Sequence, residues 1–207
     1  ITDSTTEIKD IPKLFRPTLH MISMIWKECV YYSASSLSVL LKEISNDIIT
    51  QIYNYIDPSQ IWEVELTLLC NKLKESITTL TLFKQIVLEY KEKTDLESPD
   101  RLWKLERSRV FTRLDAFLER LQDILEIAIH VEEFGHLDKI DIGGLRGESL
   151  SLIVTQVSRE FLKIQTKIQT VKYDLLDVKQ NEFEKDFFTF CTAVKDFDKR
   201  LSYVISK

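Results

Sequence analysis

All the glycines of this 207-residue chain, four in number, lie in one short stretch between Gly135 and Gly147. Glycine is the residue that adopts positive φ at no steric cost, so this stretch is where we expect the backbone to leave helical or ordinary turn geometry. Proline is equally scarce, with four in the chain. Because both residues are far below average usage, the sequence predicts few turns, long elements and an all-α fold.

The glycine-bearing stretch is predicted to be a structured connector between two helices. Its length exceeds that of most helix-to-helix connections. The apolar residues within it favour a packed loop, and they are Leu137, Ile140, Ile142 and Leu145. We expect its glycines to form a structural turn, and they are Gly135, Gly143, Gly144 and Gly147.

Apolar residues spaced alternately four and three apart form long seams in four segments, 62–90, 110–131, 150–171 and 183–204. A repeat of about 3.5 residues keeps an apolar seam facing a partner helix and gives a shallow left-handed crossing. The segments are too short and too often interrupted for one continuous coiled coil. They predict elongated antiparallel helical bundles. The last seam is rich in phenylalanine, so we expect its helix to fill a groove between several helices.

Helix boundaries follow from capping residues. We expect a first helix from about Pro17 to Tyr32 and a second, after the Ser33–Ser36 break, to about Tyr55. The sequences Asp57-Pro58 and Ser98-Pro99-Asp100 are typical helix starts and predict the third and fourth helices. The predicted organisation is a lead-in (1–16), an N-terminal bundle of about four helices (17–134), the connector (135–147) and a C-terminal helical pair packed on the preceding helices (148–207).

The fourth predicted helix carries an uneven charge pattern, with cations crowded at its start. Acidic residues end the third helix, and a hairpin would place them beside these cations. We interpret the strip either as two solvated faces of mixed charge or as part of a surface that meets another protein. The cations are Arg101, Lys104, Arg107, Arg109 and Arg113, and the acids of the third helix are Glu89, Glu92, Asp95 and Glu97.

Catalytic chemistry is not indicated by any motif. None of the histidines, His20, His130 and His136, stands at metal-ligand spacing. The stretch Gly143–Ser149 lacks the lysine and the spacing of a phosphate-binding loop. We therefore expect no catalytic residue, no metal and no bound cofactor. No uncharged apolar run approaches the roughly 18 residues that span a membrane, and no signal peptide is visible.

Other classes of function are also disfavoured. The net charge of −5 argues against a nucleic-acid surface, although Trp103 beside the arginines offers a weak RNA-stacking alternative. The cysteines are odd in number and scattered, so they fit a reducing compartment: Cys29, Cys70 and Cys191. Because the chain begins at Ile1 without a methionine, we expect it to be a segment of a longer protein.

Seven stretches, taken in order, resemble the N-terminal tail of dynein heavy chains, the axonemal kind more than the cytoplasmic. They cover nearly all of Pro17 to Val204. The stretches are Trp26-Lys27 with Tyr31-Tyr32; Leu40 to Ile49; Phe111 to Ile124; Phe134, Leu137, Lys139-Ile140 and Ile142-Gly143-Gly144 with Gly147; Tyr173 to Asp177; Phe183 to Phe187; and Phe197 to Leu201.

The resemblance implies a non-catalytic tail segment of a microtubule motor whose ATPase ring lies downstream. In that family the tail holds heavy chains together, carries intermediate and light chains, and docks the motor on the axonemal doublet microtubule. It therefore implies a location in the cytoskeleton and the cilium axoneme. It implies no nucleic-acid or membrane partner, and ATP only in the downstream motor. The alternative is a self-contained helical-bundle adaptor or tether whose likeness to dynein comes from a shared heptad composition.

Overall fold

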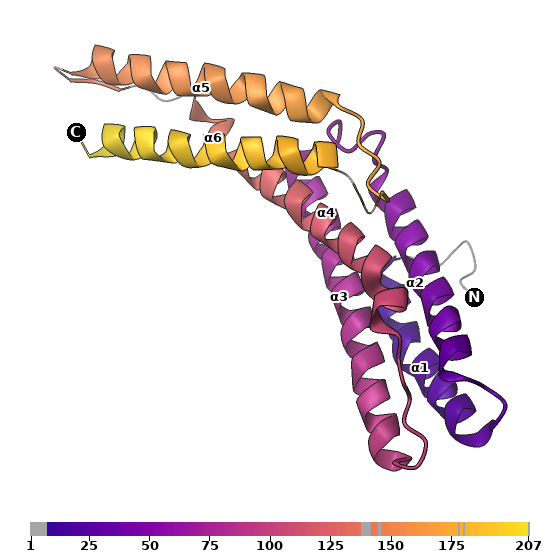
Figure 1. Ribbon diagram of the computed structural model, residues 1–207. Helices are drawn as coiled ribbons and strands as arrows, with labels where there is room; N and C mark the ends of the chain where they lie inside the picture. Colours follow the sequence, from indigo (N-terminus) through magenta and orange to yellow (C-terminus); the bar gives the residue numbers. More distant parts are fainter. Residues whose placement is uncertain (1–7, 138–141, 145, 178, 180, 207) are drawn as a thin grey trace. The chain divides into compact units, whose positions relative to one another are not determined.

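The computed structural model describes residues 8–137, 142–144, 146–177, 179 and 181–206. These residues form one short 3-10 helix, six α-helices and no strand (Figure 1). The elements are η1 (Ile8–Asp10), α1 (Ile11–Glu28), α2 (Ala34–Ile56), α3 (Leu66–Glu97), α4 (Arg107–Phe134), α5 (Gly147–Thr170) and α6 (Asn181–Ile205). The predicted all-α class is confirmed.

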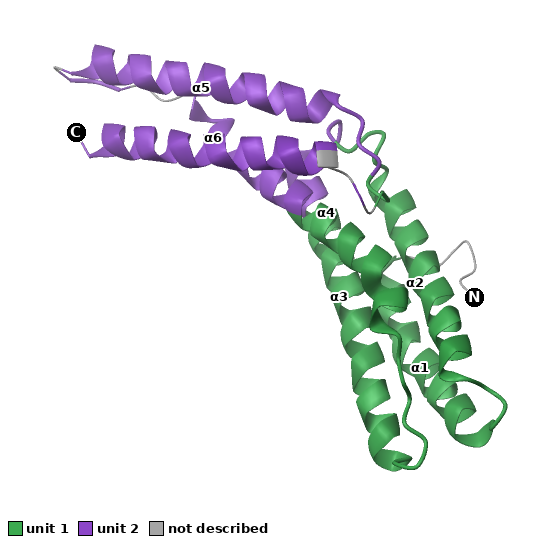
Figure 2. Cartoon of the chain, in the orientation of Figure 1, with its two compact units in different colours: residues 1–61, 71–122, 175–178 green, residues 62–70, 123–174, 179–207 purple. Residues whose placement is uncertain are grey.

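The chain divides into two compact units, shown in different colours in Figure 2. Unit 1 comprises residues 1–61, 71–122 and 175–178, and unit 2 comprises residues 62–70, 123–174 and 179–207. Unit 1 therefore holds α1, α2, most of α3 and the first part of α4. Unit 2 holds the end of α4 together with α5 and α6.

Within unit 1, helices α1 and α3 lie side by side and run in the same direction. The guanidinium of Arg16 lies 3.3 Å from the carboxylate of Glu89, and Lys27 forms an ion pair with Glu97. Between these pairs, the buried hydroxyls of Ser23 and Thr94 are hydrogen-bonded at 2.8 Å. Residue numbers on the two helices rise together along the contact, which fixes its direction.

The predicted seams of α3 and α4 lie mostly in the core. Every residue of the α4 seam is buried: Val110, Leu114, Phe117, Leu121, Ile124, Ala128 and Val131. Ser76 interrupts the apolar seam of α3 and is fully buried. Its hydroxyl donates to the carbonyl oxygen of Lys72 one turn earlier at 2.8 Å, so the buried hydroxyl does not need a partner from another helix.

Phenylalanines from three helices meet in the core of unit 2. Phe134 of α4 stacks on Phe161 of α5 with ring centroids 4.7 Å apart. Phe190 and Phe197 of α6 lie 6.0 and 6.3 Å from the same Phe161 ring. The expectation that the last helix fills a groove between several helices is thus confirmed for these two side chains.

The boundaries of α1 differ from the prediction. The helix begins at Ile11, before the predicted start at Pro17, and ends at Glu28, before Tyr32. Pro12 lies in its first turn as expected, but Pro17 lies inside the helix. An interior proline removes one backbone hydrogen bond, and Pro17 is exposed to solvent, where water can solvate the carbonyl that is left without a donor.

The predicted N-cap at Asp57 is also wrong. Asp57 instead ends α2 in the left-handed region, with φ 51°. Its carboxylate accepts hydrogen bonds from the backbone N–H and the hydroxyl of Ser59, at 3.3 and 2.5 Å. Because that carboxylate organises a turn, α3 begins only at Leu66. The N-cap expected in the Ser33–Ser36 break is confirmed, since the Ser33 side chain accepts from the backbone N–H of Ser36.

Helix α4 likewise starts later than Ser98-Pro99-Asp100 predicts, at Arg107. Residues 98–106 form a connector instead. Near its middle, the backbone N–H of Trp103 donates to a carboxylate oxygen of Asp95 at 2.6 Å, and the Trp103 ring is fully buried. The Trp103 ring stacks on Trp26 of α1, so the connector is packed within unit 1.

Candidate protein-interaction surface

The four glycines of the predicted turn have different surroundings. Gly144 has a positive φ of 99°, which favours glycine. A Cβ on Gly147 would lie 2.4 Å from the carbonyl oxygen of Ile142, whereas a Cβ on Gly143 would meet nothing within 4 Å. Gly135 follows the last residue of α4, and its N–H donates to the Val131 carbonyl at 3.0 Å. Ile140 and Leu145, expected to give the loop apolar weight, lie outside the described residues.

Sites for metals and membranes are not evident in the described part of the chain. It contains no group of three or more His, Cys, Asp or Glu side chains placed to hold a metal ion. The imidazole of His130 lies 3.1 Å from the carboxylate of Glu133, one turn away on the same helix. No helix among the described residues is long and apolar enough to cross a membrane.

The expected pairing between the acids of α3 and the cations of α4 is wrong. Glu89 and Glu97 form ion pairs with side chains of α1 instead. Arg109 donates to the hydroxyl of Ser35 at 2.9 Å and to Glu106, at the end of the preceding connector, at 3.2 Å. The acidic end of α3 faces α1 because these two helices lie side by side.

Arg101, in the connector before α4, fastens the loop between α1 and α2. Its Nη2 atom lies 3.0, 3.3 and 2.8 Å from the carbonyl oxygens of Cys29, Val30 and Tyr32. A guanidinium is a planar donor that stays charged, so one side chain can satisfy several carbonyls in a turn. The loop carbonyls would otherwise depend on water alone.

Two tryptophan rings stack beneath the Arg101 side chain, one on the other: Trp26 contacts the guanidinium and Trp103 contacts Trp26. The guanidinium of Arg101 lies 4.2 Å from the centre of the Trp26 ring, a cation–π contact. The indole N–H of Trp26 donates to the backbone oxygen of Arg101 at 2.9 Å. Trp26 in turn stacks on the buried ring of Trp103, with centroids 6.5 Å apart. The loop therefore rests on a rigid aromatic base.

Large apolar side chains project into solvent from the fastened loop. Val30 is 79% exposed, Tyr31 is fully exposed and Tyr32 is 50% exposed. Leu102, next to Arg101 in sequence, is also exposed. Exposed apolar groups on a rigid support are typical of protein contact surfaces, since a partner that buries them orders few additional side chains. We call Val30, Tyr31, Tyr32 and Leu102 the loop surface.

The sequence identified only part of this arrangement. Tyr31 and Tyr32 belong to a stretch that carries the family resemblance, and Arg101 belongs to the charge strip. Their contact joins positions far apart in the chain, so neither spacing nor periodicity signals it. The exposure of Val30 likewise depends on where α1 ends, which the sequence placed too late.

A family model described as dynein heavy chain, N-terminal region 1, matches residues 1–207. The chain is 32% identical over 207 residues to the dynein beta chain of the flagellar outer arm of Chlamydomonas reinhardtii, covering 98% of this chain and 4% of that protein. It is also 32% identical over 203 residues to human dynein axonemal heavy chain 9, covering 96% of this chain and 4% of the relative.

A third relative is the dynein-1-beta heavy chain of the flagellar inner arm I1 complex of Chlamydomonas reinhardtii, 29% identical over 199 residues, or 95% of this chain and 4% of that protein. The chain therefore corresponds to a small part of each of these relatives. Because the family model matches from the first residue to the last, the chain belongs to the N-terminal region 1 family of dynein heavy chains.

Proposed function

We propose that this chain is a non-catalytic tail segment of an axonemal dynein heavy chain and serves as a helical scaffold. The observation that carries the proposal is the family match over all 207 residues. The relatives named above are flagellar or axonemal dyneins, which supports the axonemal kind and a location in the cilium. The downstream motor would turn over ATP, and this segment would contribute attachment and assembly.

The proposed partners are other dynein heavy chains, intermediate and light chains, and the docking proteins or doublet microtubule of the axoneme. The loop surface supports this proposal because it offers apolar contacts on a support fastened by Arg101. The four glycines Gly135, Gly143, Gly144 and Gly147 are assigned a structural role in the turn, with no ligand bound by them.

Peptide mass mapping of the native polypeptide tests the motor assignment directly. A polypeptide with several phosphate-binding loops of the Gly-x4-Gly-Lys-Ser/Thr type far beyond Lys207 is the expected result. A short polypeptide that ends near Lys207 would favour a self-contained helical adaptor instead. ATP turnover by the 207-residue chain alone would contradict both scaffold assignments.

The role of the loop surface is tested in the assembled complex. Tyr31→Ser in the full-length heavy chain should reduce its co-sedimentation with the other dynein subunits on a density gradient, while motor ATPase activity is retained. Leu152→Ser is the matched control, since Leu152 is exposed on α5 outside the loop surface. Equal effects of the two substitutions would exclude a specific role for the loop.

A further inference from the structure

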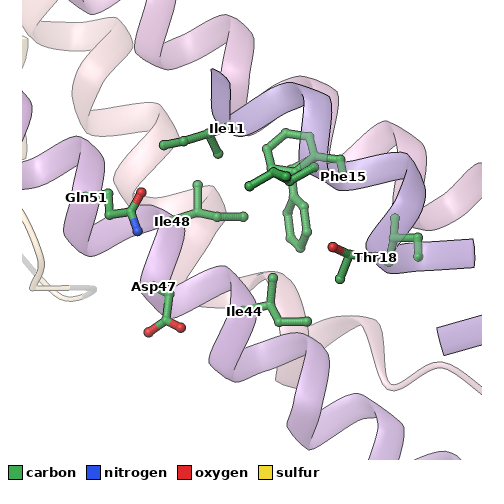
Figure 3. Close-up of a pocket in the computed structure, with 10 residues that line it drawn as sticks. Ile11, Phe15, Thr18, Ile44, Asp47, Ile48 and Gln51 are labelled. Carbon is green, nitrogen blue, oxygen red and sulfur yellow. The ribbon is translucent and has the colours of Figure 1, made fainter. Parts of the chain in front are cut away.

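An apolar groove lies between α1 and α2 in unit 1, and Phe83 of α3 also lines it. At one point it deepens to a cavity of about 60 Å³, lined mainly by aliphatic and aromatic side chains (Figure 3). Ligand pockets are several times larger, so this cavity fits part of one protein side chain better than a small molecule. The lining residues are Ile11, Leu14, Phe15, Thr18, Leu19, Ile44, Asp47, Ile48, Gln51 and Phe83.

Exposed apolar side chains continue the faces of α1 and α2 that line the cavity. Leu14 and Met21, seven residues apart on α1, are both exposed, and Met21 is 64% exposed. Leu40, on the α2 side and one turn before Ile44, is also exposed. Residues spaced by seven share one face of a helix, so the two helices present an open seam. A third helix would complete such a seam, with side chains at i, i+3 or i+4, and i+7.

Two exposed carboxylates on α2 lie beside this groove. Asp47 is the only ionisable residue that lines the cavity, among the described residues. Glu43 lies one turn before it on α2, and both side chains are exposed. Like charges spaced by four residues repel each other on a helix. In the described part of the chain neither carboxylate has an ion-pair partner, although cations elsewhere on the surface of unit 1 are paired.

We propose that the α1–α2 groove binds a basic amphipathic helix of a partner protein, with an apolar side chain in the cavity and lysine or arginine beside Glu43 and Asp47. Charge complementarity selects this occupant, because a cation would relieve the repulsion and an acidic helix would increase it. The proposal depends on the groove alone, so its failure would leave the dynein tail assignment unaffected.

The test uses the 207-residue chain and a fluorescently labelled 18-residue peptide of leucine and lysine, with its leucines on one helical face. Fluorescence anisotropy measures its dissociation constant against the chain. A glutamate peptide with the same leucine pattern and a leucine–lysine peptide of scrambled order are the controls. Binding of the patterned lysine peptide at least tenfold tighter than either control is expected. Equal binding of all three would overturn the proposal.

Substitutions in the chain test whether the lysine peptide binds at the α1–α2 groove. The double substitution Glu43→Lys with Asp47→Lys should raise the dissociation constant of the lysine peptide at least tenfold. The matched double substitution Glu92→Lys with Asp100→Lys makes the same charge change at exposed positions away from the groove. It should raise the dissociation constant of the lysine peptide less than twofold. Equal losses would show non-specific attraction by net charge and overturn the proposal.

Leu14→Ser tests the apolar part of the site at an exposed position, so the fold should be retained. It should also raise the dissociation constant of the lysine peptide at least tenfold, and an unchanged dissociation constant would overturn the proposal.

Sedimentation of the chain alone tests whether a second copy of the chain occupies the groove instead. A dimer that Leu14→Ser dissociates would assign the groove to a second copy of the chain and overturn the proposal.

Discussion

Arg101 is the residue on which the α1–α2 loop depends most directly. Its side chain donates to three loop carbonyls and stacks on Trp26. A lysine at this position would keep the charge but lose most of the ring contact with Trp26. Its three hydrogens could still reach some of these carbonyls, though with poorer geometry.

We therefore expect Arg101→Lys to reduce the free energy of unfolding by about 1–2 kcal/mol, because most of the cation–π contact with Trp26 is lost and the hydrogen bonds to the loop carbonyls are weakened. Urea denaturation followed by tryptophan fluorescence is the measurement. Arg107→Lys, an exposed site on α4, is the control and should change stability by less than about 0.5 kcal/mol. Equal effects of the two substitutions would show that the carbonyl contacts contribute little.

Cys191 in unit 2 has a thiol that is protected from ionisation. Burial, together with the carboxylate of Glu126, which lies 3.6 Å from Sγ, raises its pKa to about 11. Thiolate is the reactive form, so alkylation at neutral pH should be slow.

Glu126→Gln removes the negative charge beside the thiol, so the pKa of Cys191 should fall and alkylation should become faster. Rates of iodoacetamide labelling between pH 7 and 10, followed by peptide mass spectrometry, give the result. Glu119→Gln neutralises an exposed carboxylate elsewhere on α4 and should leave the rate unchanged. A Cys191 rate that does not respond to Glu126→Gln would contradict the electrostatic explanation.

At the start of α5, glycine is required by a close backbone contact. A Cβ at Gly147 would lie 2.4 Å from the carbonyl oxygen of Ile142, while Gly143 in the same connector has open space. Alanine normally stabilises a helix relative to glycine, by up to about 1 kcal/mol. At Gly147 the collision with a backbone atom should outweigh that gain.

Gly147→Ala should destabilise the chain by about 1–3 kcal/mol, the usual range for overpacking. Gly143→Ala should be neutral or slightly stabilising, because alanine restricts the unfolded chain and meets nothing in the folded one. Thermal melts followed by circular dichroism at 222 nm compare the melting temperature of each variant with that of the wild type. A melting temperature of Gly147→Ala at or above the wild-type value would show that the connector shifts easily.

How far the sequence predicts an element depends on whether the signal is local. The seam of α4 is a periodic pattern, and all its members are buried as expected. The predicted starts of α3 and α4 were wrong because the same residues, such as Asp57, can either cap a helix or organise a turn. For α4, the choice between these depends on contacts with side chains distant in the chain, such as the stacking of Trp103 on Trp26, which no local pattern records.

For the molecule as a whole, the fold class follows from composition, whereas the partners of each helix do not. The scarcity of glycine and the heptad seams were sufficient for an all-α prediction. The pairing of α1 with α3 was missed because it depends on contacts between residues about seventy positions apart, such as Ser23 and Thr94. The groove between α1 and α2 was missed because it joins side chains from separate helices, such as Leu14 and Asp47, that no periodicity within one helix connects.

The phenylalanine core of unit 2 should tolerate no charge. Phe190 is fully buried against Phe161, whereas Phe188, two residues away on α6, is 73% exposed. Phe190→Asp places a carboxylate in an apolar core and should cost more than about 4 kcal/mol, enough to unfold unit 2. Phe188→Asp should leave the melt nearly unchanged. A circular-dichroism melt that Phe190→Asp does not alter would show that the α6 seam is not buried.

The contact between Arg101 and the α1–α2 loop also constrains where the chain can vary in length. Exposure alone would recommend position 31 for an epitope tag or a fluorophore. Nevertheless Cys29, Val30 and Tyr32 all present their carbonyls to a single nitrogen atom, so an added residue would move at least one of them out of reach. Natural insertions and engineered labels should therefore be poorly tolerated in this loop, even though its side chains are freely accessible to solvent.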